Sequence, residues 1–250
     1  MEEDYRGSVQ KELIAEKRSF YAKYTALVLG KKGLFSFLKY ELVVLLFSGI
    51  PGALGLFLRK IFYPVLFKKV GKGVVFGRHM TLRHPKKIVV GDNTVIDDNV
   101  VLDAKGEENE GIRIGANAYI GRNTVMSCKE GSIFLDDYCN ISANCLLLSE
   151  TEIRMGKYCF LAGQCYLVAG GNHSFEKLSV PIMFQPSYSK GGINIGEDVW
   201  LGAGVIVLDG AAIGKGTIVG AGSVVTHSLP EYSIAVGTPA KKTKDRKAIV

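Results

Sequence analysis

Residues 169 to 175 read AGGNHSF, and His173 in this stretch is the residue best placed for acid–base chemistry. Imidazole has an ordinary pKa near 6.5, so it can take a proton from an alcohol at neutral pH and return it to a leaving group. Of the four histidines, only His173 lies between Gly-rich turns where a long repeat stops. The alternative is a plain surface-loop histidine, but loops on rigid scaffolds often carry function.

The repeat around this loop has a period of six residues. In the last third of the chain, apolar residues recur at Ile195, Leu201, Val207, Ile213, Val219 and Val225. Earlier runs have the same spacing in shifted phases: Phe76, Leu82; Val90, Ile96, Leu102; Ile114, Ile120, Met126; Leu135, Ile141, Leu147; Met155, Leu161, Leu167. A period of six fits neither a helix nor a two-faced strand. It predicts a triangular solenoid in which three hexads form one coil and each branched residue points inward. The glycine after each branched residue is expected at a corner with positive φ.

The cysteines follow the same spacing. Cys139, Cys145, Cys159 and Cys165 fall on a small inward position, four residues after the branched one. Cys128 is the fifth, and no CxxC pair is present. We therefore expect the cysteines to fill the core and not to bind zinc, form disulfides or react.

This pattern resembles the left-handed parallel β-helix of the hexapeptide-repeat acyltransferases. The likeness is densest over residues 193–242, where VWLGAGV and AVGTPAK are similar to the galactoside, maltose and xenobiotic O-acetyltransferases. It implies a mainly β fold, with a left-handed β-helix over 73–240 and a loop insertion at 168–192. A helical region, 1–72, precedes it, and a basic tail, 241–250, follows. The left hand comes from the resemblance, because it departs from the right-handed crossover rule.

The resemblance also implies a site. Those enzymes have a histidine at the start of such an excursion, which His173 matches as general base. Acetyl-CoA, or another acyl-CoA, is a co-substrate and not a permanently bound cofactor, and it lies between subunits of a homotrimer. Its contact positions correspond to Trp200, Ala203, Ala221, Thr226, His227, Lys241 and Lys244. Asn144 corresponds to an asparagine that holds the acceptor hydroxyl, and no metal is implied.

Two of these positions have alternative interpretations. Lys241 and Lys244 stand where arginines are common, so phosphate contact is expected to be less oriented. The KKTKDRK segment that contains them could instead be a solvated end. A pure packing role is equally open for Trp200.

The first third of the chain has a different character. Residues 8–30 are expected to be helical, and residues 42–58 carry no charge but contain the helix-breaking SGIPG. From Leu42 to Gly91 there are nine Lys or Arg residues and no acidic one. This predicts a peripheral or monotopic segment on an anionic leaflet, at the cytoplasmic face of the inner (plasma) membrane, with His79 and His84 solvated or lipid-facing. The alternative is a helical pair that caps the solenoid.

The sequence therefore predicts an acyl-CoA-dependent O-acyltransferase, with acetyl expected, that modifies a sugar hydroxyl of a lipid-linked glycan or a cell-envelope polysaccharide precursor. The rival is a non-catalytic trimeric membrane-docking scaffold. A γ-type carbonic anhydrase is disfavoured because three zinc histidines are lacking, and a sugar-nucleotide pyrophosphorylase because no Gly-rich βαβ unit precedes the coil. The net charge of +7 favours anionic partners, but the cations lie beside apolar residues, so nucleic acid is not expected.

Overall fold

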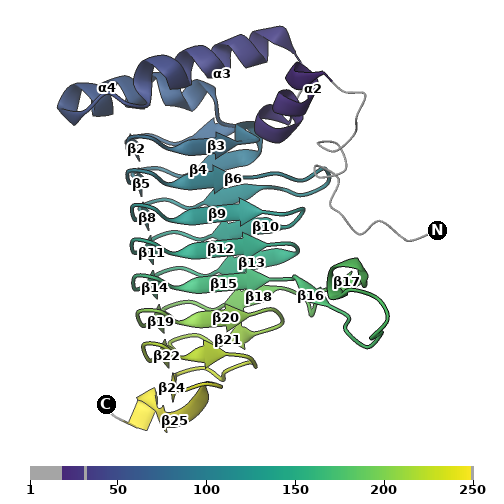
Figure 1. Ribbon diagram of the computed structural model, residues 1–250. Helices are drawn as coiled ribbons and strands as arrows, with labels where there is room; N and C mark the ends of the chain where they lie inside the picture. Colours follow the sequence, from purple (N-terminus) through teal and green to yellow (C-terminus); the bar gives the residue numbers. More distant parts are fainter. Residues whose placement is uncertain (1–18, 31–32, 249–250) are drawn as a thin grey trace.

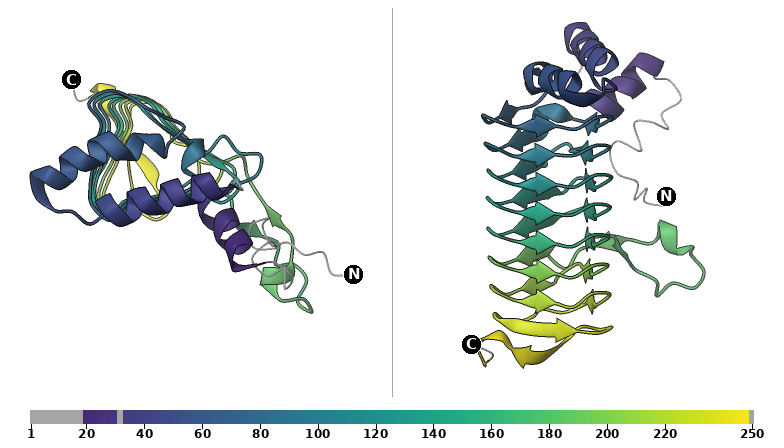
Figure 2. Two further views of the ribbon diagram at one scale, coloured as in Figure 1. Left: turned by 90° about the horizontal axis from the view of Figure 1, so that it is seen from above. Right: turned by 90° about the vertical axis from the view of Figure 1, so that its left-hand side faces the viewer.

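The computed structural model describes residues 19–30 and 33–248. Residues 8–18 of the expected N-terminal helix lie outside this part. Within it, α2 (Phe20–Tyr24) continues into a π-helical turn over Thr25–Leu29. Two further helices, α3 (Leu34–Phe47) and α4 (Gly52–Phe62), lie across one end of a long three-sided β-helix (Figures 1 and 2). We call the three helices the cap.

The β-helix confirms the fold class expected from the sequence. Each coil contributes one short strand to each of three parallel sheets, and neighbours within a sheet come from successive coils. Sheet A contains, in spatial order, β1 (Lys69–Val70), β4 (Ile88–Val90), β7 (Ile112–Ile114), β10 (Ser132–Leu135), β13 (Glu152–Met155), β18 (Ile193–Ile195) and β21 (Ala212–Ile213). Sheet B contains β2 (Val75–Phe76), β5 (Val95–Ile96), β8 (Tyr119–Ile120), β11 (Asn140–Ile141), β14 (Phe160–Leu161), β19 (Trp200–Leu201), β22 (Ile218–Val219), β24 (Ser233–Val236) and β25 (Lys241–Asp245). Sheet C contains β3 (Thr81–Arg83), β6 (Val101–Asp103), β9 (Val125–Cys128), β12 (Leu146–Ser149), β15 (Tyr166–Ala169), β20 (Ile206–Leu208) and β23 (Val224–Val225).

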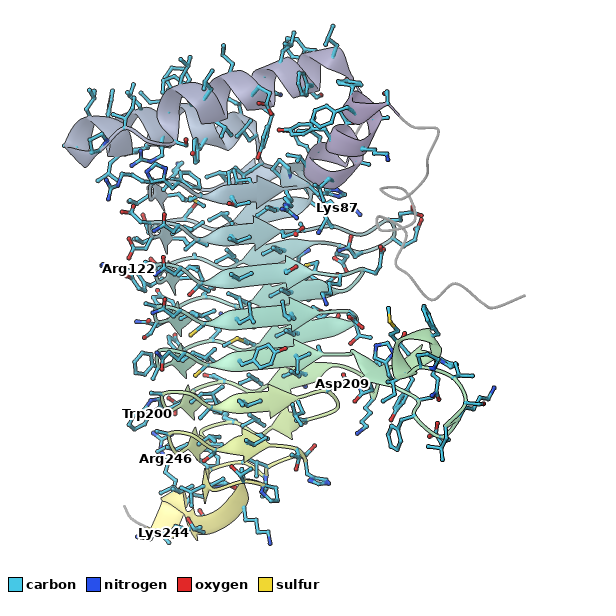
Figure 3. All side chains as sticks on the ribbon, viewed as in Figure 1. Lys87, Arg122, Trp200, Asp209, Lys244 and Arg246 are labelled. Atoms are coloured by element: carbon cyan, nitrogen blue, oxygen red, sulfur yellow. The ribbon has the colours of Figure 1, made fainter. Side chains whose placement is uncertain are left out.

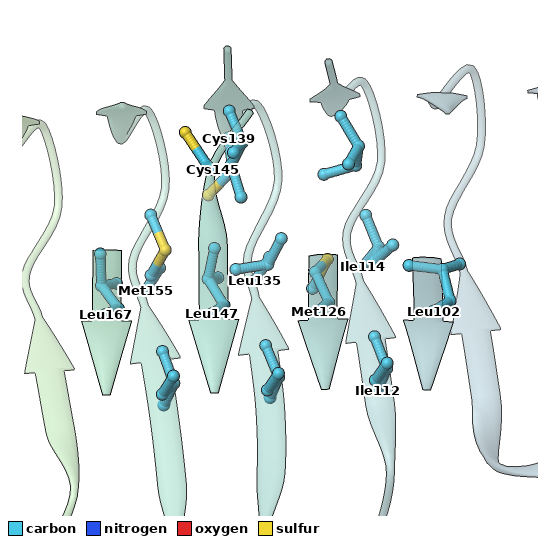
Figure 4. Packing of buried hydrophobic residues seen from close by; sticks show 14 of the residues in the cluster. Leu102, Ile112, Ile114, Met126, Leu135, Cys139, Cys145, Leu147, Met155 and Leu167 are labelled. Atoms are coloured by element: carbon cyan, nitrogen blue, oxygen red, sulfur yellow. The ribbon is translucent and has the colours of Figure 1, made fainter. Parts of the chain in front are cut away.

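The branched residues of the hexads form the core, as predicted. All of them are buried, and the register stacks each on its counterpart in the next coil. Figure 4 shows one such row, with Leu102, Met126, Leu147 and Leu167. Inward side chains of the three sheets pack on one another within each coil and on those of the neighbouring coils, so the β-helix, a three-sided prism, has one continuous apolar core.

The glycines after the branched residues have a different role from the one expected. Gly196 and Gly202 do not have positive φ; the left-handed residues come two positions later, as at Asp198 and Gly204. A Cβ on Gly202 would lie 2.6 Å from the backbone nitrogen of Ala221 in the next coil. Glycine is therefore required here by the close approach of stacked coils and not by backbone conformation.

The cysteines fill the core, as expected. All five are buried and free. Burial raises the pKa of the Cys128 thiol to about 12. The hydrogen bond with a neighbouring thiol, followed by burial, raises the pKa of Cys139 and Cys165, and the same bond lowers the pKa of their partners Cys159 and Cys145. Thiols held in the protonated form are poor nucleophiles and poor metal ligands.

The cap is tied firmly to the first coil. The helices α3 and α4 are separated at the SGIP segment, where the sequence predicts a break. The buried Arg59 guanidinium donates to the carbonyls of Phe47, Ile50 and Phe76 at 2.8–3.1 Å, and so joins both helices to β2. Among the residues described, no helix is both long and apolar enough to cross a bilayer.

His84 is not solvated, which corrects one expectation. Its side chain is only 6% exposed, and Nε2 lies 2.8 Å from the carbonyl oxygen of Ala26 in the cap. Because a carbonyl only accepts, the ring carries its proton on Nε2. Desolvation lowers the pKa of His84, so the neutral ring is favoured. His79 is exposed, as expected.

The other end of the β-helix is closed by the chain itself. Within the basic segment 241–250, residues Lys241–Asp245 form β25, which pairs antiparallel with β24. Lys241, Lys242 and Lys244 are thus carried on a strand at the last edge of sheet B, and Arg246 and Lys247 follow in a short 3-10 helix.

Candidate active site

The insertion that carries His173 leaves the prism between β15 and β18, at the edge where sheet C turns into sheet A (Figure 1). It begins and ends in a short antiparallel pair, β16 (Asn172–His173) and β17 (Ser187–Tyr188), in which His173 lies opposite Ser187. The imidazole is exposed, and no side chain among the described residues hydrogen bonds to it. His173 is therefore presented on a short ordered ribbon, with its ring available to a ligand or a neighbouring molecule.

The ribbon is anchored by Asp209, a residue that sequence reasoning missed. Its carboxylate is 5% exposed and lies one coil beyond β15, directly under the insertion (Figure 3). It accepts hydrogen bonds from Asn172 Nδ2 at 2.8 Å and Ser189 Oγ at 3.1 Å, and from the backbone N–H groups of Lys190 at 2.5 Å and Gly192 at 2.9 Å. One buried charge thus holds both ends of the insertion, and charge-assisted bonds of this kind are stronger than neutral ones.

Gln185 organises the middle of the insertion and was also missed. Its buried amide donates to the carbonyls of Lys177 and Val180, both at 2.9 Å, and accepts from the Lys177 N–H at 3.3 Å. Around it lies an open hollow of about 420 Å³. Large apolar side chains of the insertion remain exposed, up to 99% at Leu178; the others are Phe175, Ile182, Met183, Phe184 and Tyr188.

The predicted cofactor positions are divided between two sides of the prism. Thr226 and His227 follow β23 on the same edge as the insertion, two coils further on, and Thr226 Oγ1 lies 2.7 Å from His227 Nδ1. Ala203 and Ala221 are exposed in successive coils at the opposite edge, between sheets B and C. A single protomer therefore does not bring all the predicted residues together.

The aromatic and basic positions lie on sheet B. Trp200 is half exposed on β19, with its ring nearly parallel to that of Phe160 at 6.4 Å. Lys241 and Lys244 are exposed on β25. Figure 3 shows Trp200 and Lys244 on the side of the molecule opposite the insertion.

Asn144 lies at the edge between sheets B and C, in the corner before β12. Its backbone is left-handed, with φ of 60°, and its Oδ1 accepts from Asn123 Nδ2 at 3.0 Å. It therefore belongs to a ladder of corner asparagines that also includes Asn99. Its Nδ2 has no partner among the described residues, so it could still donate to a ligand.

No local signal in the sequence reveals the role of Asp209. Acids also occur at other corners of the coils, such as Asp137, and Asp209 meets Asn172 across 37 residues of chain. Within the described chain, no cluster of three or more His, Cys, Asp or Glu side chains is arranged to hold a metal ion.

Comparisons with known proteins agree with this picture. The family model for bacterial transferase hexapeptide (six repeats) matches residues 192–227. A probable acetyltransferase of Mycobacterium tuberculosis is 33% identical over 54% of this chain and 45% of its own length. The chain spans about half the length of the curated relatives it matches.

Solved structures extend the likeness over most of the β-helix. AntD, an N-acyltransferase from Bacillus cereus solved with dTDP and 3-hydroxybutyryl-CoA, superposes with a TM-score of 0.50 and 26% identity over 73% of this chain and 86% of AntD. The polySia-specific acetyltransferase NeuO superposes with a TM-score of 0.51 and is 26% identical over 71% of this chain and 85% of NeuO. The predicted resemblance is confirmed: the chain forms a β-helix with hexad repeats and is similar to hexapeptide-repeat acyltransferases.

Proposed function

We propose that the protein is an acyl-CoA-dependent O-acyltransferase, with acetyl as the expected acyl group, that acts on a sugar hydroxyl. The observation that carries the proposal is His173 on a ribbon fixed by Asp209, on a coil of the acyltransferase type. A non-catalytic scaffold would have no need to anchor both ends of a loop that presents an exposed imidazole. The likeness to AntD and NeuO supports acyl transfer to a sugar.

In this mechanism His173 acts as general base. The imidazole takes the proton from the acceptor hydroxyl as its oxygen attacks the thioester carbonyl. The carbon–sulfur bond then breaks, the acyl group remains on the sugar oxygen, and the proton passes from imidazolium to the CoA thiolate. A backbone N–H at a coil corner can stabilise the tetrahedral oxyanion, worth about 3 kcal/mol per donor.

The split of the predicted residues over two sides supports a homotrimer. A threefold axis parallel to the prism would set the edge with His173 of one protomer against the edge with Ala203 and Ala221 of the next, at matched heights. The exposed apolar side chains of the insertion would then be covered by the neighbour, as such patches usually are. In this arrangement each site needs two protomers.

The order of residues along the neighbour's edge suggests how the substrates lie. Going away from the cap, Asn144 comes first, then the level where His173 leaves, then Ala203 and Ala221, and finally the lysines of β25. The pantetheine arm would run past the small alanines, and Lys241 and Lys244 would face its phosphates. The acceptor would enter from the cap side, with Asn144 Nδ2 on its hydroxyl.

We further propose that the acceptor is a lipid-linked glycan or a cell-envelope polysaccharide precursor, at the cytoplasmic face of the plasma membrane. The apolar, basic cap at the acceptor's end of the groove supports this. The experiment is to incubate the protein with acetyl-CoA and membrane extract, measure thiol release, and find the acetylated product by mass spectrometry. No release above the rate of hydrolysis, and no CoA binding, would favour the scaffold.

A further inference from the structure

The cap has an outer apolar face that nothing in the described chain covers. In α3, Tyr40 and Val43 pack on the coil, whereas the opposite side is exposed, 79% at Phe35 and 81% at Leu45. The full set on α3 and α4 is Leu34, Phe35, Leu38, Leu42, Leu45, Leu46, Leu54, Leu56, Phe57, Ile61 and Phe62. Figure 3 shows side chains of α3 and α4 that project away from the end of the prism. We call this set the apolar face.

Exposed lysines flank the apolar face. Lys60 is on α4, and Lys68 and Lys69 begin the first coil; none forms a salt bridge with another described residue. Glu41 is the one acidic residue between 19 and 91, and it accepts a hydrogen bond from the Tyr24 hydroxyl. From the second coil onward, acids reappear and pair, as in Arg78–Asp98 at 3.0 Å.

We propose that the apolar face docks on the surface of an anionic bilayer, with its side chains among the acyl chains and the lysines on the lipid phosphates. Apolar burial and electrostatic attraction together are what interfacial binding requires. The charge pattern selects this occupant over a second copy of the face, because pairing two copies would bring the unpartnered lysines together. The association that we propose is peripheral or monotopic.

The direction of docking follows from the rigid junction between cap and coil. Arg59 bonds both helices to β2, and the Tyr40 hydroxyl donates to the carbonyl of Leu82 at 2.7 Å. Since α3 and α4 lie across the end of the prism, the long axis of the β-helix stands roughly upright on the membrane (Figure 2).

This orientation sets the height of the site. From β3 to β15, sheet C advances four coils, or about 19 Å at the usual strand spacing. The helical layer adds roughly 10 Å. His173 therefore lies about 30 Å from the bilayer. If the proposed function holds, the sugar that is acetylated is separated from the lipid by other sugars of the glycan.

The test uses the full chain and vesicles of phosphatidylcholine with and without phosphatidylglycerol, separated by sedimentation. Binding should need the anionic lipid and weaken as salt is raised. Leu42→Gln/Leu45→Gln/Phe57→Gln and Lys60→Gln/Lys68→Gln/Lys69→Gln should each weaken partitioning by about tenfold or more. The matched control, Lys129→Gln/Lys157→Gln/Lys215→Gln, removes the same charge from the coils and should bind like wild type.

Orientation is measured with an environment-sensitive dye on an introduced cysteine. Leu45→Cys should show enhanced emission with anionic vesicles, and Leu178→Cys on the insertion should not. Three results would overturn the proposal. They are equal vesicle binding by all variants, equal enhancement of emission at both dye positions, and a doubled mass of the protein in solution that the apolar substitutions abolish. His173→Ala should bind vesicles normally, so failure of docking and failure of catalysis are told apart.

Discussion

Asn172 Nδ2 donates to Asp209 Oδ2 at 2.8 Å, across 37 residues of chain. This bond joins the residue next to the proposed base to the coil below it. The same carboxylate also receives the backbone N–H groups of Lys190 and Gly192, where the insertion returns to the prism. The position of His173 is thus set by a carboxylate that would not touch the substrates.

Asp209→Asn should lower kcat about 10- to 100-fold, because a small misplacement of a catalytic group is costly. In the wild type, N–H donors face both carboxylate oxygens of Asp209. In the variant, one of these oxygens is replaced by an NH2 group that cannot accept their hydrogen bonds, so the ribbon loosens. The KM for acetyl-CoA should change little, and limited proteolysis within residues 172–190 should become faster. Steady-state kinetics and mass mapping of the cleavage sites measure both effects.

Asp137→Asn is the matched control. Asp137 accepts from the backbone of Ala116 at another corner of the prism. This variant should retain wild-type kcat, and equal losses in both variants would argue against a positioning role for Asp209.

Two inactive variants should complement each other if each site spans two protomers. His173→Ala removes the base on one edge, and Ala221→Trp blocks the groove on the other. Co-expressed, they should recover about a quarter of wild-type activity, because random assortment leaves that share of sites intact. No recovery in trimers shown to be mixed would place the whole site within one protomer.

Lys241→Gln/Lys244→Gln should weaken acetyl-CoA binding roughly threefold to tenfold, since exposed lysines contribute modestly to phosphate contact. Calorimetry with acetyl-CoA and with a pantetheine thioester lacking the nucleotide distinguishes the cause. The pantetheine compound should bind both proteins equally. An equal loss for both ligands would mean that the lysines do not contact phosphate.

His84 should make the cap junction sensitive to acid. Its folded-state pKa is lowered by desolvation, so the unfolded chain takes up the proton first. The stability that the neutral ring supports is fully present above about pH 6.5 and is lost as pH falls from there toward the folded-state pKa. Thermal unfolding followed between pH 7.5 and 5.5 measures this loss.

His84→Asn is the comparison, because asparagine tolerates the φ of 48° at this position. It should flatten the dependence of Tm on pH over the same range. An unchanged slope would show that other groups account for the acid sensitivity.

The inward residues could be predicted because the period of six is local. Leu147 and Leu167 occupy equivalent places in successive coils, and spacing alone reveals this. The role of the glycines was predicted wrongly. Gly202 is required because the backbone of Ala221 in the next coil lies close to it, and the spacing of residues along the sequence does not describe this contact.

The anchor and the buried histidine could not be predicted, because their partners are remote. His84 meets Ala26, 58 residues earlier, and Asp209 meets the insertion across 37 residues. The candidate base was found because the repeat stops at it. The groups that fix its position become visible only when the coils are stacked.

The most direct test of the account is acyl transfer by His173→Ala compared with wild type, measured as thiol release from acetyl-CoA in membrane extract, with CoA affinity determined on the same samples. The account predicts a rate lower by about 10²- to 10⁴-fold, with CoA affinity unchanged. A His173→Ala protein that transfers acetyl groups at the wild-type rate would contradict it.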